Sequence, residues 1–363
     1  MPPHDLELTW TSRGPTSWAL LPVAGLYALL SGLHRAAYRY GLMPVERLPI
    51  PVLVVGNVVA GGAGKTPVVV ALVHHLQALG LRPGVISRGH GRSSRGVREV
   101  KPESDAADAG DEPLLIARRT GAPVFIGERR ALAGRALLTQ HPQVQVLVCD
   151  DGLQHHALAR DIEICVFDER GTGNGWPLPA GPLREPWPRR VDFTLSPPLV
   201  GQEIHDSALS TDSAQRRDED CSARPGDGME TGAFTVRRRL ARTAVNAQGQ
   251  QAPLETLRAK EPLALAGIAR PAAFFTMLAE AGCPPVDTLP LPDHHDFRKG
   301  PALAADRCLV CTEKDAVKLW PLRPDAWAVP LEVTIETGFW TALVQRLAGL
   351  YPQLSSADGS QTA

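Results

Sequence analysis

The stretch Val59-Ala-Gly-Gly-Ala-Gly-Lys-Thr66 lies between an apolar, β-branched run at 51–55 and a segment at 66–79 that is typical of a helix. Its glycines let backbone N–H groups approach phosphate oxygens, and the positive end of the helix dipole points to the same place. Lys65 is expected to contact the β- and γ-phosphates, and the Thr66 hydroxyl is expected to bind Mg²⁺. The stretch therefore predicts a strand, loop and helix unit that binds a nucleotide.

The loop differs from the usual phosphate-binding pattern at one position, because Val59 replaces the first glycine. A guanine-reading Asn-Lys-x-Asp tetrapeptide is absent from the sequence, where the nearest candidate is Thr312-Glu-Lys-Asp315, so ATP is favoured over GTP. The loop does not define the acceptor: water gives an ATPase or GTPase, and an alcohol gives a kinase. The residues expected to bind the nucleotide are Val59, Ala60, Gly61, Gly62, Ala63, Gly64, Lys65 and Thr66.

Apolar runs alternate with helical segments on both sides of a polar region, which predicts an α/β fold with a mostly parallel sheet and a second, smaller α/β domain. In the first series we expect strands at 84–86, 123–126, 144–149 and 162–167, and helices at 112–119 and 129–139. In the second we expect strands at 263–266, 308–312 and 327–335, and helices at 272–281 and 339–350. The expected division is an apolar helix at 1–42, a phosphate-loop domain at 43–200, a polar insertion and linker at 201–257, the smaller domain at 258–352 and a disordered tail at 353–363.

The composition is that of a soluble globular enzyme. The chain has 363 residues, of which 44% are hydrophobic and 21% charged, and its net charge of −1 excludes binding through bulk charge. Six scattered cysteines do not indicate a disulfide framework, so a reducing compartment is favoured. Cys308 and Cys311 form a C-x-x-C pair, but they lie in an apolar run that is typical of a buried strand, which disfavours a zinc or redox role.

The chain carries no formal charge from Trp18 to Leu33, and arginines follow at 35 and 39. This segment is shorter than the roughly 20 residues that a helix needs to cross a bilayer. It is expected either to lie in the membrane interface or to pack on its own protein, and the residues alone do not decide between these.

Polar residues follow two of the expected strands. Asp150 and Asp151 come directly after an apolar run, at the end where ligands bind in open α/β sheets, so we expect them on the Mg²⁺ side of the site. Arg88 and Arg92 follow another strand, where they are expected to neutralise a transferring phosphoryl group, to hold a phosphate on the acceptor, or to lie in a solvated loop.

Two further positions suggest acid–base chemistry. Asp111 opens an expected helix, where it serves either as the N-cap or as the base that accepts the proton of an attacking hydroxyl. His294, beside Asp293, is expected to be an acid–base or charge-orienting group that reaches across a cleft between the domains. A rigid, proline-rich segment at 181–186 is expected to carry binding groups.

Taken in order, these motifs make the chain resemble the tetraacyldisaccharide 4′-kinase family, the lipid A 4′-kinases of Gram-negative bacteria. The resemblance runs from the N-terminal apolar segment to about Leu350 and is weaker between 201 and 257. Its carriers are Val55-Gly-Asn57, Gly61-Gly-Ala-Gly-Lys-Thr-Pro67, Ser87-Arg-Gly-His-Gly-Arg92, Gly110-Asp-Glu-Pro113, Asp150-Asp-Gly-Leu-Gln-His155, Leu178-Pro-Ala-Gly-Pro-Leu-Arg-Glu-Pro186, Ala266-Gly-Ile-Ala-Arg-Pro271, Asp293-His294 and Thr312-Glu-Lys-Asp-Ala-Val-Lys318.

The resemblance implies a kinase that uses ATP and Mg²⁺ to transfer the γ-phosphate to the 4′-hydroxyl of an acylated glucosamine disaccharide 1-phosphate, forming lipid IVA. It implies a peripheral or interfacially anchored enzyme at the cytoplasmic face of the bacterial inner membrane, without a nucleic-acid or required protein partner. It also implies a P-loop nucleoside triphosphate hydrolase-like domain joined to a smaller α/β domain by a β-ribbon. The apolar segment is then expected at the membrane surface.

The resemblance also implies a role for individual residues. Asp111 corresponds to the general base, with His294 supporting it and Lys65 as a further catalytic residue. The implied metal-binding residues are Thr66, Asp150, Asp151 and Glu185, and the implied substrate-binding residues are Asn57, Arg88, Arg92 and Arg184.

The residues by themselves leave two other functions open. One is a P-loop ATPase or GTPase whose hydrolysis drives a protein partner, which the unusual Val59 position allows. The other is a membrane-tethered module that senses nucleotide without turning it over, with the apolar segment as its anchor.

Overall fold

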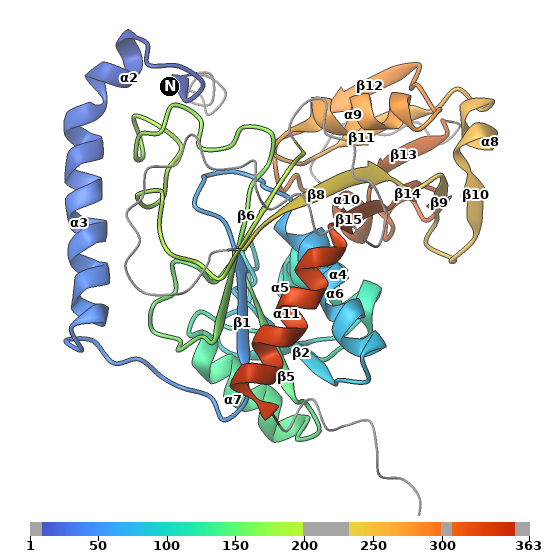
Figure 1. The fold of residues 1–363 in the computed structure, drawn as a ribbon. Helices are drawn as coiled ribbons and strands as arrows, with labels where there is room; N and C mark the ends of the chain where they lie inside the picture. Colours follow the sequence, from blue (N-terminus) through green and yellow to red (C-terminus); the bar gives the residue numbers. More distant parts are fainter. Residues whose placement is uncertain (1–8, 199–231, 299–306, 353–363) are drawn as a thin grey trace, which may run out of the picture.

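The computed structural model describes residues 9–198, 232–298 and 307–352. Within these ranges the chain forms two α/β domains, each built on one sheet (Figure 1). Of the polar insertion and linker predicted at 201–257, residues 201–231 lie outside the described residues, as does the tail at 353–363. The described part, 232–257, forms strands of both sheets and a short helix. The α/β fold class is confirmed.

The large sheet is mostly parallel and has nine strands among the described residues, in the order β15-β8-β7-β6-β1-β5-β2-β4-β3. Only β3 and β15 run antiparallel to their neighbours. The three central strands are buried along their whole length, which explains their continuous apolar sequence. The strands are β1 (Val52–Gly56), β2 (Pro83–Ser87), β3 (Arg98–Val100), β4 (Val124–Ile126), β5 (Val146–Asp150), β6 (Ile162–Val166), β7 (Phe193–Ser196), β8 (Gly232–Leu240) and β15 (Leu331–Ile335).

Helices cover both faces of this sheet. Alternate strand residues point to opposite sides, so Leu53 and Val55 contribute to one apolar cluster while Val52 and Val54 contribute to the other. The first cluster is completed by α4 (Lys65–Ala78), α6 (Asp111–Thr120) and α11 (Thr337–Leu350), and the second by α7 (Arg130–Gln140). A single turn, α5 (Ala106–Ala109), precedes α6.

The small domain has a six-stranded sheet among the described residues, in the order β10-β9-β14-β13-β11-β12. Its strands β11, β12, β13 and β14 are parallel, and β9 and β10 add an antiparallel edge. The strands are β9 (Thr243–Val245), β10 (Gln251–Pro253), β11 (Leu263–Ala266), β12 (Asp287–Pro290), β13 (Leu309–Thr312) and β14 (Trp327–Val329), and the helices are α8 (Leu254–Arg258), α9 (Pro271–Glu280) and α10 (Glu313–Leu319).

Two strands connect the domains as an antiparallel ribbon. The second half of β8 pairs with β15, from Leu240 opposite Leu331 to Val236 opposite Ile335 (Figure 1). The single strand expected at 327–335 is therefore wrong: β14 belongs to the small sheet and β15 to the large one. Pro330 separates them, because it has no N–H to continue a ladder of hydrogen bonds.

The last helix also differs from the prediction. We expected 339–350 in the smaller domain, but α11 packs on the large sheet, where the Phe339 ring contacts Phe193 and Phe234 at centroid distances of 5.4 and 5.8 Å. The ribbon is the physical reason, since β15 carries the chain back to the large sheet before the helix begins. The two domains are thus not consecutive in sequence.

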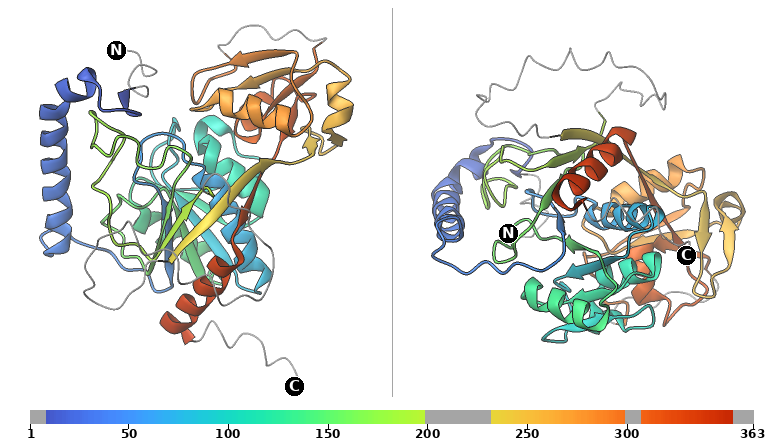
Figure 2. Two further views of the ribbon diagram at one scale, coloured as in Figure 1. Left: turned by 45° about the horizontal axis from the view of Figure 1, so that its top comes forward. Right: turned by 60° about the horizontal axis from the view of Figure 1, so that its bottom comes forward.

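The N-terminal apolar segment forms α2 (Pro15–Ala19) and the long helix α3 (Leu21–Arg39). Figure 2 shows α3 at the outer side of the large domain, away from the small one. One face is docked through Ala24, which is fully buried, whereas the leucines at 26, 29, 30 and 33 are each more than half exposed. Among the described residues, no helix is long and apolar enough to span a bilayer.

Replacing Phe339 with Ala tests the assignment of α11 to the large core. The ring has no exposed surface, so we expect Phe339→Ala to lower the free energy of unfolding by about 3–5 kcal/mol in a denaturant titration followed by circular dichroism. Val344→Ala, on a partly exposed position of the same helix, should cost less than about 1 kcal/mol. Equal, small effects of the two substitutions would contradict the assignment.

Candidate active site

The phosphate loop connects β1 to α4 as predicted. Gly61 and Gly64 adopt φ angles of +91° and +66°, which side chains other than glycine rarely accept, and Gly64 caps α4. Val59 is 2% exposed and bridges to Leu183, so the missing first glycine is explained by a buried contact with the segment at 181–186. The backbone of Ala60 is fixed in the same way, because its N–H donates to Pro182 O at 2.8 Å.

Lys65 is held at the loop by two partners. Its Nζ lies 3.1 Å from Asn57 Oδ1 and 3.5 Å from Asp151 Oδ1, and Arg184 Nη1 lies 3.4 Å from the same Asp151 oxygen. Asn57 was expected to bind substrate, but it is fully buried and its Nδ2 donates to the Val59 carbonyl at 2.5 Å. Asn57 therefore holds the phosphate loop and Lys65 in place through these hydrogen bonds.

The paired aspartates lie at the carboxyl end of β5, and their pKa values are shifted in opposite directions. Burial, together with the nearby Glu112 and Asp151 carboxylates, raises the pKa of Asp150 to about 7. For Asp151, burial opposes ionisation but Lys65 and Arg184 outweigh it, so its pKa is lowered. Ser87 Oγ donates to Asp150 Oδ2 at 3.1 Å, whereas the buried Oδ1 has no hydrogen-bond partner among the described residues.

A bound metal ion would give this Asp150 oxygen the partner that it lacks among the described residues. Mg²⁺ prefers carboxylate and hydroxyl oxygens near the phosphates that it neutralises, and Asp150, Asp151 and Thr66 are side chains of that kind. They follow the adjacent parallel strands β5 and β1, whose carboxyl ends meet at one edge of the sheet. In the described ranges, no three His, Cys, Asp or Glu side chains gather as a ready protein-only metal site.

Glu185 is arranged differently from its predicted metal-binding role. Its buried carboxylate accepts from Gln154 Nε2 at 2.7 Å and from Arg189 Nη1 at 3.2 Å, and Arg35 of α3 lies 3.5 Å away. Gln154 also donates to the Asn57 carbonyl at 3.0 Å. Both carboxylate oxygens are thus already engaged, and Glu185 links α3 to the base of the phosphate loop.

Asp111 and His294 meet across the two domains. His294 Nδ1 lies 3.0 Å from Asp111 Oδ2, and Lys318 Nζ of α10 lies 2.9 Å from the same oxygen. The alternative role as an N-cap is not seen, because Gly110 takes the cap position and Asp111 is the first residue of α6. Burial raises the pKa of Asp111, but the hydrogen bonds and charges of His294 and Lys318 outweigh it and lower the pKa below its ordinary value.

The loop after β2 contacts this pair through His90, a residue of the Ser87–Arg92 motif to which sequence analysis gave no role. The His90 ring lies 5.6 Å from the His294 ring, measured between centroids. Arg88 is exposed, whereas Arg92 donates to the Gly96 carbonyl of its own loop at 2.7 Å, so the structure engages Arg92 in holding that loop. The neighbours of His90 could not be found from the sequence, because His294 lies about two hundred positions away.

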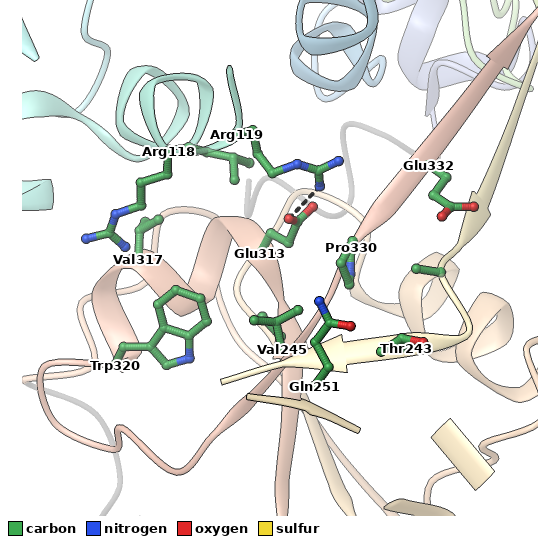
Figure 3. Close-up of a pocket in the computed structure, with 13 residues that line it drawn as sticks. Arg118, Arg119, Thr243, Val245, Gln251, Glu313, Val317, Trp320, Pro330 and Glu332 are labelled. Atoms are coloured by element: carbon green, nitrogen blue, oxygen red, sulfur yellow. Dashed lines mark hydrogen bonds and ion pairs between the residues drawn. The ribbon is translucent and has the colours of Figure 1, made fainter. Parts of the chain in front are cut away.

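A cavity of about 420 Å³ lies between α6 and the small sheet, beside the ribbon. Figure 3 shows that the Arg119 and Glu313 side chains cross it, and they form an ion pair at 2.6 Å. None of the predicted site residues lines it. At this cavity the ion pair between Arg119 and Glu313 links α10 to the large domain.

Comparison with known proteins gives one consistent family. Residues 16–348 match the model of the family described as tetraacyldisaccharide-1-P 4′-kinase. The chain is 55% identical to the tetraacyldisaccharide 4′-kinase of Acidovorax ebreus (strain TPSY) over 346 residues, covering 95% of each protein, and 50% identical to that of Polaromonas naphthalenivorans (strain CJ2), covering 97% of each. A solved "apo" form of LpxK from Aquifex aeolicus in complex with ATP is similar in structure, with a TM-score of 0.73 and 26% identity over 92% of this chain and 99% of that one.

Proposed function

We propose a function for this chain from the premise that it belongs to the tetraacyldisaccharide-1-P 4′-kinase family. As a member of that family it is an ATP-dependent kinase of lipid A biosynthesis, and it phosphorylates the 4′-hydroxyl of a tetraacyldisaccharide 1-phosphate. Membership decides between the kinase and the hydrolase or sensor that the residues alone left open. The observation that carries the mechanism is the Asp111–His294 pair at the same edge of the sheet as the phosphate loop.

A series of contacts supports the placement of these groups at one edge of the sheet. Asp150, at the end of β5, accepts from Ser87 at the end of β2. Three residues further, His90 lies against His294, which contacts Asp111. The nucleotide loop, the aspartates and the Asp111–His294 pair are therefore neighbours, as phosphate transfer between two bound substrates requires.

In the proposed reaction Asp111 is the general base. Within the described part of the chain, His294 and Lys318 both contact Oδ2 of Asp111, so we propose that Oδ1 accepts from the acceptor hydroxyl. The 4′-oxygen forms a bond to the γ-phosphorus, the bond from that phosphorus to the β,γ-bridging oxygen breaks, and ADP leaves while the hydroxyl proton passes to Asp111. The backbone N–H groups of the loop and Lys65 bind the phosphates of ATP.

Mg²⁺ is proposed as the second cofactor, held by Thr66, Asp150 and Asp151. When bound, it neutralises charge on the phosphate oxygens of ATP. Lys65 lies 3.5 Å from Asp151, and we propose that it contacts the phosphates of the nucleotide beside this carboxylate. For Glu185 we propose a supporting role instead of a metal contact, since Gln154, Arg189 and Arg35 already occupy its carboxylate.

Arg184 and Arg88 are proposed contacts for the acceptor's phosphate. Arg184 lies at Asp151, and the exposed Arg88 follows β2 at the same edge. For Asn57 and Arg92 we propose structural roles within their loops, because their polar atoms are committed to neighbouring backbone or to Lys65.

A membrane surface is the proposed second partner, at the cytoplasmic side where ATP is available. Residues at 23, 26, 30 and 33 lie on one face of α3, and each is more than half exposed. The other face is docked, since Ala24 is fully buried there, and Tyr27, at the border between the two faces, donates to the Arg184 carbonyl at 2.8 Å. Such a helix can lie in the membrane interface with its apolar face among acyl chains, where a four-chain lipid acceptor also resides.

Transfer of label from γ-labelled ATP to the tetraacyl disaccharide 1-phosphate, in mild detergent with Mg²⁺, tests the catalytic roles. We expect Asp111→Asn to lower kcat by about 10²–10⁴-fold, because it removes the proton acceptor, and Lys65→Ala to abolish detectable transfer. Lys101→Ala and Asp325→Asn, both on exposed positions, serve as controls. Full transfer by folded Asp111→Asn, or label released only as free phosphate by the wild type, would contradict the proposal.

Substitutions on the exposed face of α3 test the membrane contact. We expect Leu26→Glu with Leu30→Glu to weaken sedimentation with liposomes by about tenfold or more, because each buried leucine contributes roughly 1.5–3 kcal/mol. Nucleotide binding should be unchanged. Val286→Glu, which alters an exposed apolar residue of the small domain, is the matched control. Undiminished sedimentation of the double variant would rule out this face as the contact.

A further inference from the structure

Two lysines of α10 reach the Asp111–His294 pair from the small domain. Lys318 Nζ lies 2.9 Å from Asp111 Oδ2, and Lys314 Nζ lies 3.4 Å from His294 Nε2. The residues are four positions apart and therefore share one face of the helix. The sequence motif Thr312-Glu-Lys-Asp-Ala-Val-Lys318, to which no role has been assigned so far, thus carries two cations to the proposed base.

The helix that presents these lysines is rigidly fixed. Asp315 is fully buried, and its Oδ2 accepts from the Gly267 N–H at 3.0 Å and from Thr312 Oγ1 at 2.7 Å. The carbonyl of Gly267 in turn accepts the N–H of His294 at 3.1 Å. At the start of α10, Glu313 is paired with Arg119 of α6. These contacts therefore fix the positions of the two lysines and His294 relative to one another.

The contact between Lys314 and His294 favours one tautomer of the neutral imidazole. An ammonium group has only donors, so a hydrogen bond across the 3.4 Å between Lys314 Nζ and His294 Nε2 needs Nε2 as its acceptor, which leaves the single proton of a neutral ring on Nδ1. Nδ1 faces Asp111 Oδ2, which is consequently the acceptor of that hydrogen bond. A protonated ring would direct an Nε2–H at an ammonium, which is repulsive.

We propose that Lys314 is a positioning residue that fixes His294 as the neutral Nδ1–H tautomer. It thereby makes His294 the donor and Asp111 the acceptor of the hydrogen bond between them. His294 donates to Asp111, and Asp111 takes the proton of the acceptor hydroxyl, whereas Nε2 of His294 is covered by the ammonium and does not act as a base. This inference rests on the proposed role of Asp111 in catalysis.

The charges around His294 explain why the lysine is needed. Asp111 faces the ring from α6, Asp293 lies beside it on its own loop with Oδ1 3.9 Å from Nε2, and His90 faces it from the loop after β2. Two carboxylates favour a charged ring, and Lys314 opposes this. The lysine keeps its own proton, since burial lowers its pKa but Glu112 at 3.2 Å and Asp293 at 3.3 Å raise it more strongly.

Removing the ammonium should have a specific consequence. Without Lys314, the ring that faces Asp111 and Asp293 gains a proton more readily and forms an ion pair with Asp111. That pair weakens Asp111 as an acceptor until the ring loses the proton at higher pH. The acidic limb of the pH profile of kcat therefore moves to higher pH in Lys314→Met.

The tautomer of His294 is the direct test. The full chain, labelled with ¹⁵N-histidine in mild detergent, reports the protonation of each ring nitrogen by NMR, with the His294→Gln spectrum as the assignment. We expect a protonated Nδ1 and an unprotonated Nε2 in the wild type, and loss of that state in Lys314→Met. A wild-type ring protonated on Nε2 overturns the proposal, even if the variant does not fold.

Kinetic measurements then distinguish a positioning role of Lys314 from a contact that has no effect on the reaction. We expect Lys314→Met to lower kcat at pH 7 by about tenfold or more, with recovery at higher pH, Lys314→Arg to restore most activity, and Lys260→Met, an exposed lysine of the same domain, to have no effect. An equal loss at every pH with the Nδ1–H tautomer retained overturns the proposal. A changed tautomer with unchanged kcat supports the role of Lys314 and refutes Asp111 as the base.

Discussion

A buried carboxylate needs compensating charge, and the arrangement of the two domains follows from that requirement at Asp111. An ionised carboxylate removed from water is costly unless it is paired and hydrogen-bonded. Asp111 belongs to the large domain and is 6% exposed, yet its partners His294 and Lys318 both come from the small domain. The small domain thus supplies both partners of this carboxylate, whereas the phosphate loop belongs to the large domain.

The phosphate loop and the paired aspartates after β5 could be located from the sequence, because the residues that define each of them are close together in the sequence. Glycines at fixed spacing, an apolar strand before them and a helix after them define the phosphate loop, and Asp150 and Asp151 follow directly from the strand that delivers them. The two-domain α/β fold follows from the alternation of strands and helices. The unusual Val59 is the exception, since it forms a buried bridge to Leu183, which lies more than a hundred positions further along the chain.

The parts that sequence did not predict depend on contacts between distant segments. Glu185 was assigned to the metal because of its motif, but its carboxylate is engaged by Arg189 and, across 150 positions, by Arg35 of α3. The final helix was placed in the wrong domain because the ribbon that returns it to the large sheet has no local signature. Lys314 and Lys318 stood in a quoted motif, yet the carboxylates of α6 that they contact, Glu112 and Asp111, lie about two hundred residues earlier. α3 is likewise tied to the segment at 181–186, because Tyr27 donates to the Arg184 carbonyl across more than 150 positions.

The central claim is that Asp111 and His294, contributed by different domains, act as one unit in phosphate transfer. A double-variant cycle measures this directly, with kcat/KM for the wild type, Asp111→Asn, His294→Gln and the double variant in the label-transfer assay. Residues that act together are strongly non-additive, so the account predicts a double variant no more than about threefold slower than Asp111→Asn alone. Losses that multiply across the two substitutions would show independent roles and contradict it.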